Sequence, residues 1–183
     1  MAHPNFVSMP IPFNFQRWLE DHRHELVPPV GNKNLTPESD DYIVMVVAGP
    51  NARKDYHYNE TEEFFYQLEG RITVRTQQDG QIVDYVLEAG DMFLCPAKTP
   101  HSPIREAGSV GLVIERKRAG KGFTDGLLWF CDACNTPLHS AYFELNNIET
   151  DFLPHFHQFY GDVDLRTCSS CQSIMDSDPR FSK

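Results

Sequence analysis

The stretch DYHYNETEEFFYQLEG, residues 55–70, sets one histidine, His57, and three glutamates directly ahead of the apolar run at residues 64–66. The last of these glutamates, Glu63, adjoins a segment that reads as a buried strand. Carboxylates are rarely buried unless they are paired or bound to a metal. A glutamate in this position therefore predicts a cationic partner inside the fold.

The sequence on both sides of this stretch, as far as about residue 118, consists of short apolar segments that turn signals separate. The segments are YIVMVVA at 42–48, FFYQLEG at 64–70, RITVRT at 71–76, IVDYVLE at 82–88, MFLCP at 92–96 and GLVIERK at 111–117. The dipeptides Asp79-Gly80 and Gly90-Asp91 are typical of tight turns. This rhythm predicts an all-β protein, an antiparallel sandwich or barrel.

Different patterns flank this region. Residues 14–26 place Trp18 and Leu19 at helical spacing, which predicts one N-terminal helix packed on the body of the protein. The composition changes after a stretch rich in glycine and basic residues, and the cysteines follow it. We therefore expect a barrel with its N-terminal helix at residues 1–120 and a small metal-binding segment at residues 121–183.

Composition limits the range of functions. The 183 residues carry a formal net charge of −10, and such a surface is unsuited to nucleic acid or anionic lipid. No segment approaches the ~20 apolar residues of a membrane span, and the start lacks the basic and apolar regions of a secretory signal. We expect a cytoplasmic protein that binds neither nucleic acid nor membranes.

Four of the five cysteines form two Cys-x-x-Cys pairs, Cys131 with Cys134 and Cys168 with Cys171. In a reducing compartment this spacing favours a structural four-cysteine metal site over disulfides, and four thiolates accept iron or zinc. We expect this site to hold the C-terminal segment against the barrel. The histidines of the HFH run at 155–157 are the alternative metal ligands.

Two spacings resemble the paired motifs of the cupin superfamily, whose small β-barrel holds a metal near one mouth. The second motif of that family supplies a histidine five residues after a proline, as His101 follows Pro96 here. Asn59 replaces the second histidine of the first motif. The resemblance therefore implies three metal ligands, His57, Glu63 and His101. Two imidazoles and one carboxylate suit the Fe(II) of non-haem oxygenases, with open positions for substrate and O2.

Longer stretches across nearly the whole chain resemble the 3-hydroxyanthranilate 3,4-dioxygenase family, in its short form with an appended cysteine–metal site. The stretches are PFNFQRWLEDH at 12–22, PPVGN at 28–32, YHYNETEEFFYQLEG at 56–70, HSPIR at 101–105, LVIER at 112–116, CDAC at 131–134 and CSSC at 168–171. The resemblance implies cleavage of the ring of 3-hydroxyanthranilate by O2. The product, 2-amino-3-carboxymuconate semialdehyde, cyclises to quinolinate, a precursor of NAD. The resemblance also implies a homodimer.

The same resemblance implies a set of substrate contacts. Arg53 and Arg105 each lie four residues from a histidine of the metal set, and a guanidinium suits the planar carboxylate of the substrate. Glu115 is implied as the acceptor for the substrate amine and as an aid to deprotonation, which makes Arg53 and Glu115 the catalytic candidates. Strand alternation places Glu115 on one face with Val113. Asn32 is implied to lie near the pocket.

Two other functions stay open. A cupin oxygenase acting on a different small acid would keep the metal set but would not need Arg53, Arg105 and Glu115. A non-catalytic cupin sensor would bind a ligand in the barrel and use its four-cysteine tail to contact a partner. Oxygen uptake with 3-hydroxyanthranilate separates the sensor from the enzyme.

Overall fold

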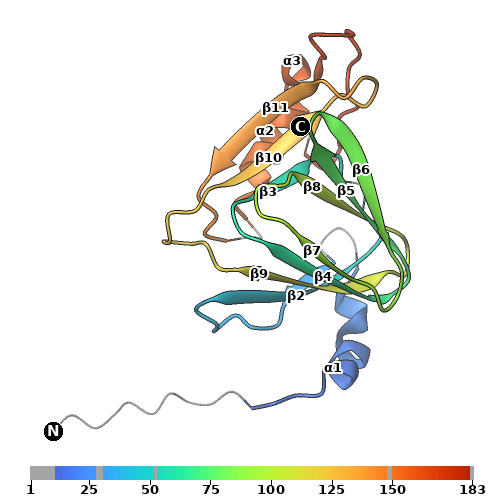
Figure 1. The fold of residues 1–183 in the computed structure, drawn as a ribbon, viewed down its shortest axis with the longest axis vertical. Coiled ribbons are helices and arrows are strands. Elements are labelled where there is room, and N and C mark those ends of the chain that lie inside the picture. Colours follow the sequence, from blue (N-terminus) through green and yellow to red (C-terminus); the bar gives the residue numbers. More distant parts are fainter. Residues whose placement is uncertain (1–10, 28–30, 52, 148–149, 182–183) are drawn as a thin grey trace, which may run out of the picture.

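The body of the protein is formed by two antiparallel β-sheets that face each other as a barrel (Figure 1). The computed structural model describes residues 11–27, 31–51, 53–147 and 150–181. The expected all-β fold with an antiparallel barrel is confirmed. The helices are α1 (Phe15–His22), the 3-10 helix η1 (Arg23–Glu25), α2 (Leu153–Gly161) and α3 (Val163–Arg166).

One sheet has five strands in the order β1-β2-β9-β4-β7. These strands are β1 (Asn32–Asn34), β2 (Tyr42–Ala48), β4 (Glu63–Glu69), β7 (Met92–Cys95) and β9 (Val110–Arg116). Its inner face carries a cluster that includes Met45, Phe65 and Val113, which meets Ile72 and Val74 of the other sheet. This apolar layer fills one part of the barrel and leaves the polar site residues together in another.

The other sheet has six strands in the order β11-β10-β3-β8-β5-β6. These strands are β3 (Tyr56–Asn59), β5 (Ile72–Gln78), β6 (Gln81–Leu87), β8 (His101–Arg105), β10 (Asp125–Phe130) and β11 (Pro137–Phe143). β10 and β11 follow residue 120 in the chain, and β10 extends this sheet beside β3. The division of the chain into residues 1–120 and 121–183 stays a prediction.

The hairpin between β5 and β6 turns at the expected dipeptide. Asp79 has a φ of 50° and Gly80 a φ of 76°, so both central residues are left-handed. This is the backbone of a type I′ turn, whose twist matches that of the strands it joins. The turn fixes the register that pairs Gln78 with Gln81.

The N-terminal helix packs as its apolar spacing predicts. Asn14 caps α1 by accepting a hydrogen bond from the backbone N–H of Arg17. Leu19 is buried and Trp18 half-buried, in one cluster with Val46 of β2. Pro28 and Pro29, which are expected to end the helix, lie outside the described residues. No helix of the described residues is long and apolar enough to cross a membrane.

The second helical region lies at the other end of the molecule from α1 (Figure 1). The aromatic side chains of α2 pack on Trp129 of β10, which is fully buried and stacks on Phe159 with ring centroids 4.4 Å apart. Tyr160 and Met175 complete this cluster. The aromatic run therefore packs against the six-stranded sheet of its own chain.

We expect Trp129→Ala to lower the free energy of unfolding by about 3–5 kcal/mol, because it removes a large buried side chain and leaves a cavity. Met92→Ala is the control, since Met92 is 66% exposed on β7, and its change should stay within about 0.5 kcal/mol. Urea unfolding measures both. Equal losses for the two variants would mean that α2 is not packed on β10.

Candidate metal centre and substrate pocket

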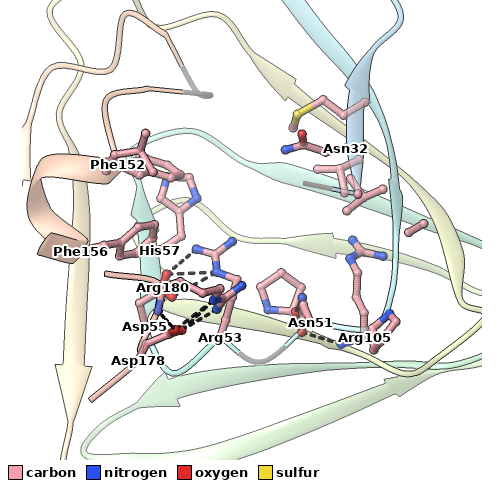
Figure 2. Close-up of a pocket in the computed structure, with 18 of the residues that line it drawn as sticks. Asn32, Asn51, Arg53, Asp55, His57, Arg105, Phe152, Phe156, Asp178 and Arg180 are labelled. Atoms are coloured by element: carbon pink, nitrogen blue, oxygen red, sulfur yellow. Dashed lines mark hydrogen bonds and ion pairs between the residues drawn. The ribbon is translucent and has the colours of Figure 1, made fainter. Parts of the chain in front are cut away.

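The barrel encloses a pocket of about 460 Å³. In Figure 2, Arg105 and Asn32 lie on one side of it and Phe152 and Phe156 on the other, with Arg53 between. Most of the residues predicted for the site line this pocket. They are Asn32, Arg53, His57, Glu63, Arg105 and Glu115. The pocket is large enough for a small aromatic molecule.

The three side chains of the predicted metal set come together from three strands. His57 of β3 and His101 of β8 are direct partners in the six-stranded sheet, and Glu63 begins β4 in the facing sheet. All three are buried, and one ligand atom from each lies within 4.8 Å of the others. Oε2 of Glu63 lies 3.1 Å from Nε2 of His101 and 3.6 Å from Nδ1 of His57. The arrangement can hold one metal ion.

The outer nitrogen of each imidazole is held by a group that only accepts hydrogen bonds. Nε2 of His57 donates to Oδ1 of Asp125 at 2.9 Å, and Nδ1 of His101 donates to the carbonyl oxygen of Thr99 at 2.9 Å. The proton of each neutral ring is thereby placed on the outer side. The lone pairs of the two inner nitrogens point toward Glu63, as metal ligation requires.

The charges buried around this point do not balance among themselves. Glu63, Glu115 and Asp125 are carboxylates no more than 6% exposed. Glu115 and Asp125 share the guanidinium of Arg118, whereas the partners of Glu63 are the two histidines. These carboxylates outnumber the guanidinium that pairs with them, and an uncompensated buried charge costs several kcal/mol. A divalent cation between the histidines and Glu63 cancels this excess. The residues present therefore fit a divalent metal.

In the metal-free protein, protons take the place of that cation. Burial would lower the pKa of His57, but its hydrogen bonds to Asp125 and Glu63 outweigh burial and raise it. Burial would lower the pKa of His101 as well, but the charge of Glu63 together with hydrogen bonds to Cys95 and Glu63 raises it well above its usual value. Burial also acts against ionisation of Glu63, yet the two histidines hold the pKa of that carboxyl well below its usual range.

Arg105 is the site's unpaired cation. It is 4% exposed, and its Nη1 atom has no hydrogen-bond partner among the described residues. Burial lowers the pKa of this guanidinium to about 10, so it stays charged at neutral pH. Asn51 fixes the backbone below it by accepting from the N–H of Arg105 at 3.1 Å (Figure 2). Arg53 differs, because it is paired with Asp55.

Glu115 faces the pocket from β9 together with Val113, as the strand alternation predicts. Its Oε2 atom accepts from Nη1 of Arg118 at 2.7 Å and from Nδ2 of Asn59 at 3.2 Å. Burial and the charge of Glu63 raise the pKa of Glu115, while Arg118 opposes this rise. Asn59, which stands where cupins carry a second histidine, thus contacts the glutamate instead.

One wall of the pocket is apolar and comes from beyond residue 150. Phe152, Phe156 and Tyr160 reach it from α2 and its start, and Phe181 reaches it from the C-terminal segment. The ring of Phe152 lies against that of His57, with centroids 5.4 Å apart. These residues were not expected at the site, and their only signal in the sequence is the aromatic density of residues 152–160.

The four cysteines of the two Cys-x-x-Cys pairs come together at the end of β10 and after α3. Sγ of Cys131 lies 3.6 Å from that of Cys171, and Sγ of Cys134 lies 3.5 Å from that of Cys168. No disulfide joins them. The hydroxyl of Ser173 and nearby backbone N–H groups lower the pKa of Cys131 to about 6, which favours the thiolate that a metal binds.

The two cysteine loops have the same backbone pattern. The N–H of Asn135 donates to the carbonyl of Cys131, and that of Gln172 donates to the carbonyl of Cys168. Asn135 and Gln172 are also two of the few non-glycine residues with positive φ, at 59° and 63°. The loops form a matched pair around one point, which fits a tetrahedral four-cysteine metal site. Among the described residues, the histidines of 155–157 form no such group.

Comparison with known proteins agrees with this geometry. The family model described as 3-hydroxyanthranilic acid dioxygenase matches residues 8–160. A 3-hydroxyanthranilate 3,4-dioxygenase of Xanthomonas euvesicatoria is 51% identical over 93% of this chain and 95% of its own. One from Paraburkholderia phytofirmans is 48% identical over 89% of this chain and 93% of its own.

Among solved structures, a cupin-2 domain containing protein from Shewanella frigidimarina matches 57% of this chain and 94% of its own, with 21% sequence identity and a TM-score of 0.44. The assignment rests on the family model and on the curated relatives, which cover most of both sequences. The chain belongs to the 3-hydroxyanthranilic acid dioxygenase family.

Proposed function

We propose that this protein is a 3-hydroxyanthranilate 3,4-dioxygenase that opens the aromatic ring with O2 and uses Fe(II) held by His57, Glu63 and His101. The observation that carries the proposal is the buried, unpaired guanidinium of Arg105 in the same pocket as this metal set. A site with one spare cation next to a metal calls for a ligand that brings a carboxylate together with metal-binding groups. 3-Hydroxyanthranilate brings a carboxylate, an amine and a phenol.

The metal set is of the type that non-haem Fe(II) oxygenases use. Two neutral imidazoles and one carboxylate leave an Fe(II) centre one net positive charge and open positions. When bound there, the iron would supply sites for the substrate's phenol and amine and for O2. Both oxygen atoms enter 2-amino-3-carboxymuconate semialdehyde, so the reaction consumes no outside reductant.

The chain's own residues bind and orient the substrate. Arg105 binds the carboxylate, and Arg53 assists it from the pocket's centre (Figure 2). Glu115 accepts a proton from the substrate's polar edge, for which its raised pKa is suited. Asn32 borders the same side of the pocket. The aromatic wall covers the ring and excludes water, which strengthens these polar contacts.

The four-cysteine site is proposed to be structural, with iron or zinc, at Cys131, Cys134, Cys168 and Cys171. The chain before Cys168 supplies α2, and the chain after Cys171 supplies Phe181, so both flanks of this site reach the pocket wall. A metal at this point would hold the wall in place. Ring cleavage needs no electrons from it.

A homodimer and a cytoplasmic location also belong to the proposal. Unbridged cysteines suit a reducing compartment. Sedimentation of the purified protein tests the dimer. The product leads to quinolinate, and whether it serves NAD synthesis or the breakdown of an aromatic nutrient follows from the organism's other enzymes.

We expect the metal-free protein to bind two Co(II) ions, one in the barrel and one at the cysteines. His101→Ala should lose the barrel ion alone, because it removes one of three ligands there. Cys168→Ser should lose the ion whose absorption has thiolate charge-transfer bands. Optical titration measures both, and the two variants control for each other. A His101→Ala protein that still binds two ions would contradict the barrel site.

We expect Fe(II)-loaded protein, mixed anaerobically with 3-hydroxyanthranilate and then with air, to take up one O2 per substrate and form a new absorbing product. Arg105→Ala should raise KM by roughly 10- to 100-fold, since a charge-assisted contact is worth roughly 1.5–3 kcal/mol. Arg105→Lys should recover only part of this loss, because lysine lacks the planar pair of donors.

Arg75→Ala is the matched control, because Arg75 is a half-buried arginine that is paired with Asp84 and does not line the pocket. Its KM should equal that of the wild type. Substrate binding without oxygen uptake would favour a sensor. Turnover with an unchanged KM in Arg105→Ala would favour an oxygenase for a different small acid.

A further inference from the structure

Two buried charged residues outside the predicted site connect its metal ligand to its glutamate. Asp125 is 0% exposed at the start of β10, and Arg118 is 2% exposed in the segment between β9 and β10. Neither is among the residues that line the pocket. Buried charges of this kind are retained at a cost, so their contacts indicate what they do.

Asp125 reaches the ring of His57 across the sheet. In the pairing of β3 with β10, Asp125 lies opposite Asn59 and Leu127 lies opposite His57, so Asp125 is the diagonal neighbour of His57 on the inner face. Its Oδ1 atom lies 2.9 Å from Nε2 of His57. A carboxylate only accepts, so this contact keeps the proton on Nε2 and leaves Nδ1 free toward Glu63.

Arg118 fixes Asp125 in the orientation that this contact needs. Nε of Arg118 donates to Oδ2 of Asp125 at 2.8 Å and also lies 3.1 Å from Oδ1. Nη1 of the same guanidinium donates to Oε2 of Glu115 at 2.7 Å. One rigid planar group therefore sets the positions of two carboxylates, one facing the metal ligand and one facing the pocket.

We propose that Asp125, held by Arg118, is a positioning residue that orients the imidazole of His57 and selects the ring form whose Nδ1 can bind the metal. The inference deepens the proposed function and rests on its barrel metal site. It extends the assembly of the site to β10, a strand that supplies no metal ligand. Arg118 also ties the position of Glu115 to that of Asp125, so the metal ligand and the substrate's proton acceptor share one support.

The substitution Asp125→Asn distinguishes a positioning role from a purely structural one, because Arg118 fixes the orientation of the new amide. A guanidinium only donates, so the amide oxygen of the new side chain must face Arg118 and its NH2 group must face His57. Nε2 of His57 then accepts, the ring proton moves to Nδ1, and the metal-binding nitrogen is blocked. Asp125→Ala removes the support without imposing the wrong ring form.

The test is optical titration of the metal-free full chain with Co(II), which needs no substrate. Asp125→Asn should weaken Co(II) binding in the barrel by roughly 10- to 100-fold, and Asp125→Ala should weaken it less. A purely structural buried ion pair predicts the opposite order, because alanine removes more contacts than asparagine. The opposite order, or unchanged affinity in both variants, would overturn the proposal.

Two controls keep the result interpretable. Asp84→Asn breaks the exposed pair with Arg75 and should leave Co(II) binding unchanged. The thiolate bands of Co(II) at the cysteine site report in the same titration that each variant is folded. If Asp125→Asn does not fold, Arg118→Lys serves, since a point charge cannot hold both carboxylates. It should weaken barrel binding several-fold, and unchanged affinity would contradict the proposal.

The oxygen-uptake assay of the wild type separates this inference from the proposed function. If the Asp125 variants bind Co(II) in the expected order but the wild type cleaves no ring, the positioning role stands and the proposed activity is rejected. If the wild type cleaves the ring but the Asp125 variants bind Co(II) normally, the proposed activity stands and the positioning role is rejected.

Discussion

The excess of negative charge inside the barrel is the constraint on which the site depends. Glu63, Glu115 and Asp125 are buried together, and among the described residues Arg118 is the guanidinium paired with this group, through Glu115 and Asp125. Such a group of carboxylates is stable only with further positive charge at its centre. The two histidines provide a place for it, either as protons or, with their inner lone pairs, as a divalent metal. We propose that Glu63, the last of the three glutamates ahead of the apolar run, is buried because it meets this cation.

A second charge without a partner in the described part of the chain, the guanidinium of Arg105, lies on the other side of the same pocket. Arg105 is positive and buried, and its Nη1 atom has no hydrogen-bond partner among the described residues. A substrate that places a carboxylate at Arg105 and polar groups at the metal relieves both. The aromatic wall from α2 and from Phe181 keeps water away from these contacts and strengthens them.

Much of the fold and of the site could be predicted from the sequence, for physical reasons that differ between elements. β2 is a continuous apolar run of seven residues, and β9 alternates buried and half-buried positions from Gly111 to Glu115, so the sequence predicts both strands almost to the residue. β3 and β8 do not show this pattern, because YHYN and HSPIR carry the polar residues of the site. Their residues were found by resemblance to a family, and the strands themselves were not predicted.

Asp125 shows why the remainder was missed. It stands directly ahead of the buried strand GLLWF, which is the same signal that drew attention to Glu63. A division of the chain near residue 120 separates it from the barrel, although its strand pairs with β3. The contacts of Arg118 with Glu115 and Asp125 are only three and seven residues apart in the chain, but they start from the segment between β9 and β10, where no periodic pattern marks them. The aromatic wall was missed for a similar reason, because its residues would be apolar whether they line the pocket or only pack in the core.

The most direct test is anomalous diffraction at the iron edge from crystals grown anaerobically with Fe(II). The account predicts a peak in the barrel within bonding distance of Nδ1 of His57, Nε2 of His101 and a carboxylate oxygen of Glu63, with Nε2 of His57 still on Asp125. A barrel without a peak, in crystals whose cysteine site is filled, would contradict it.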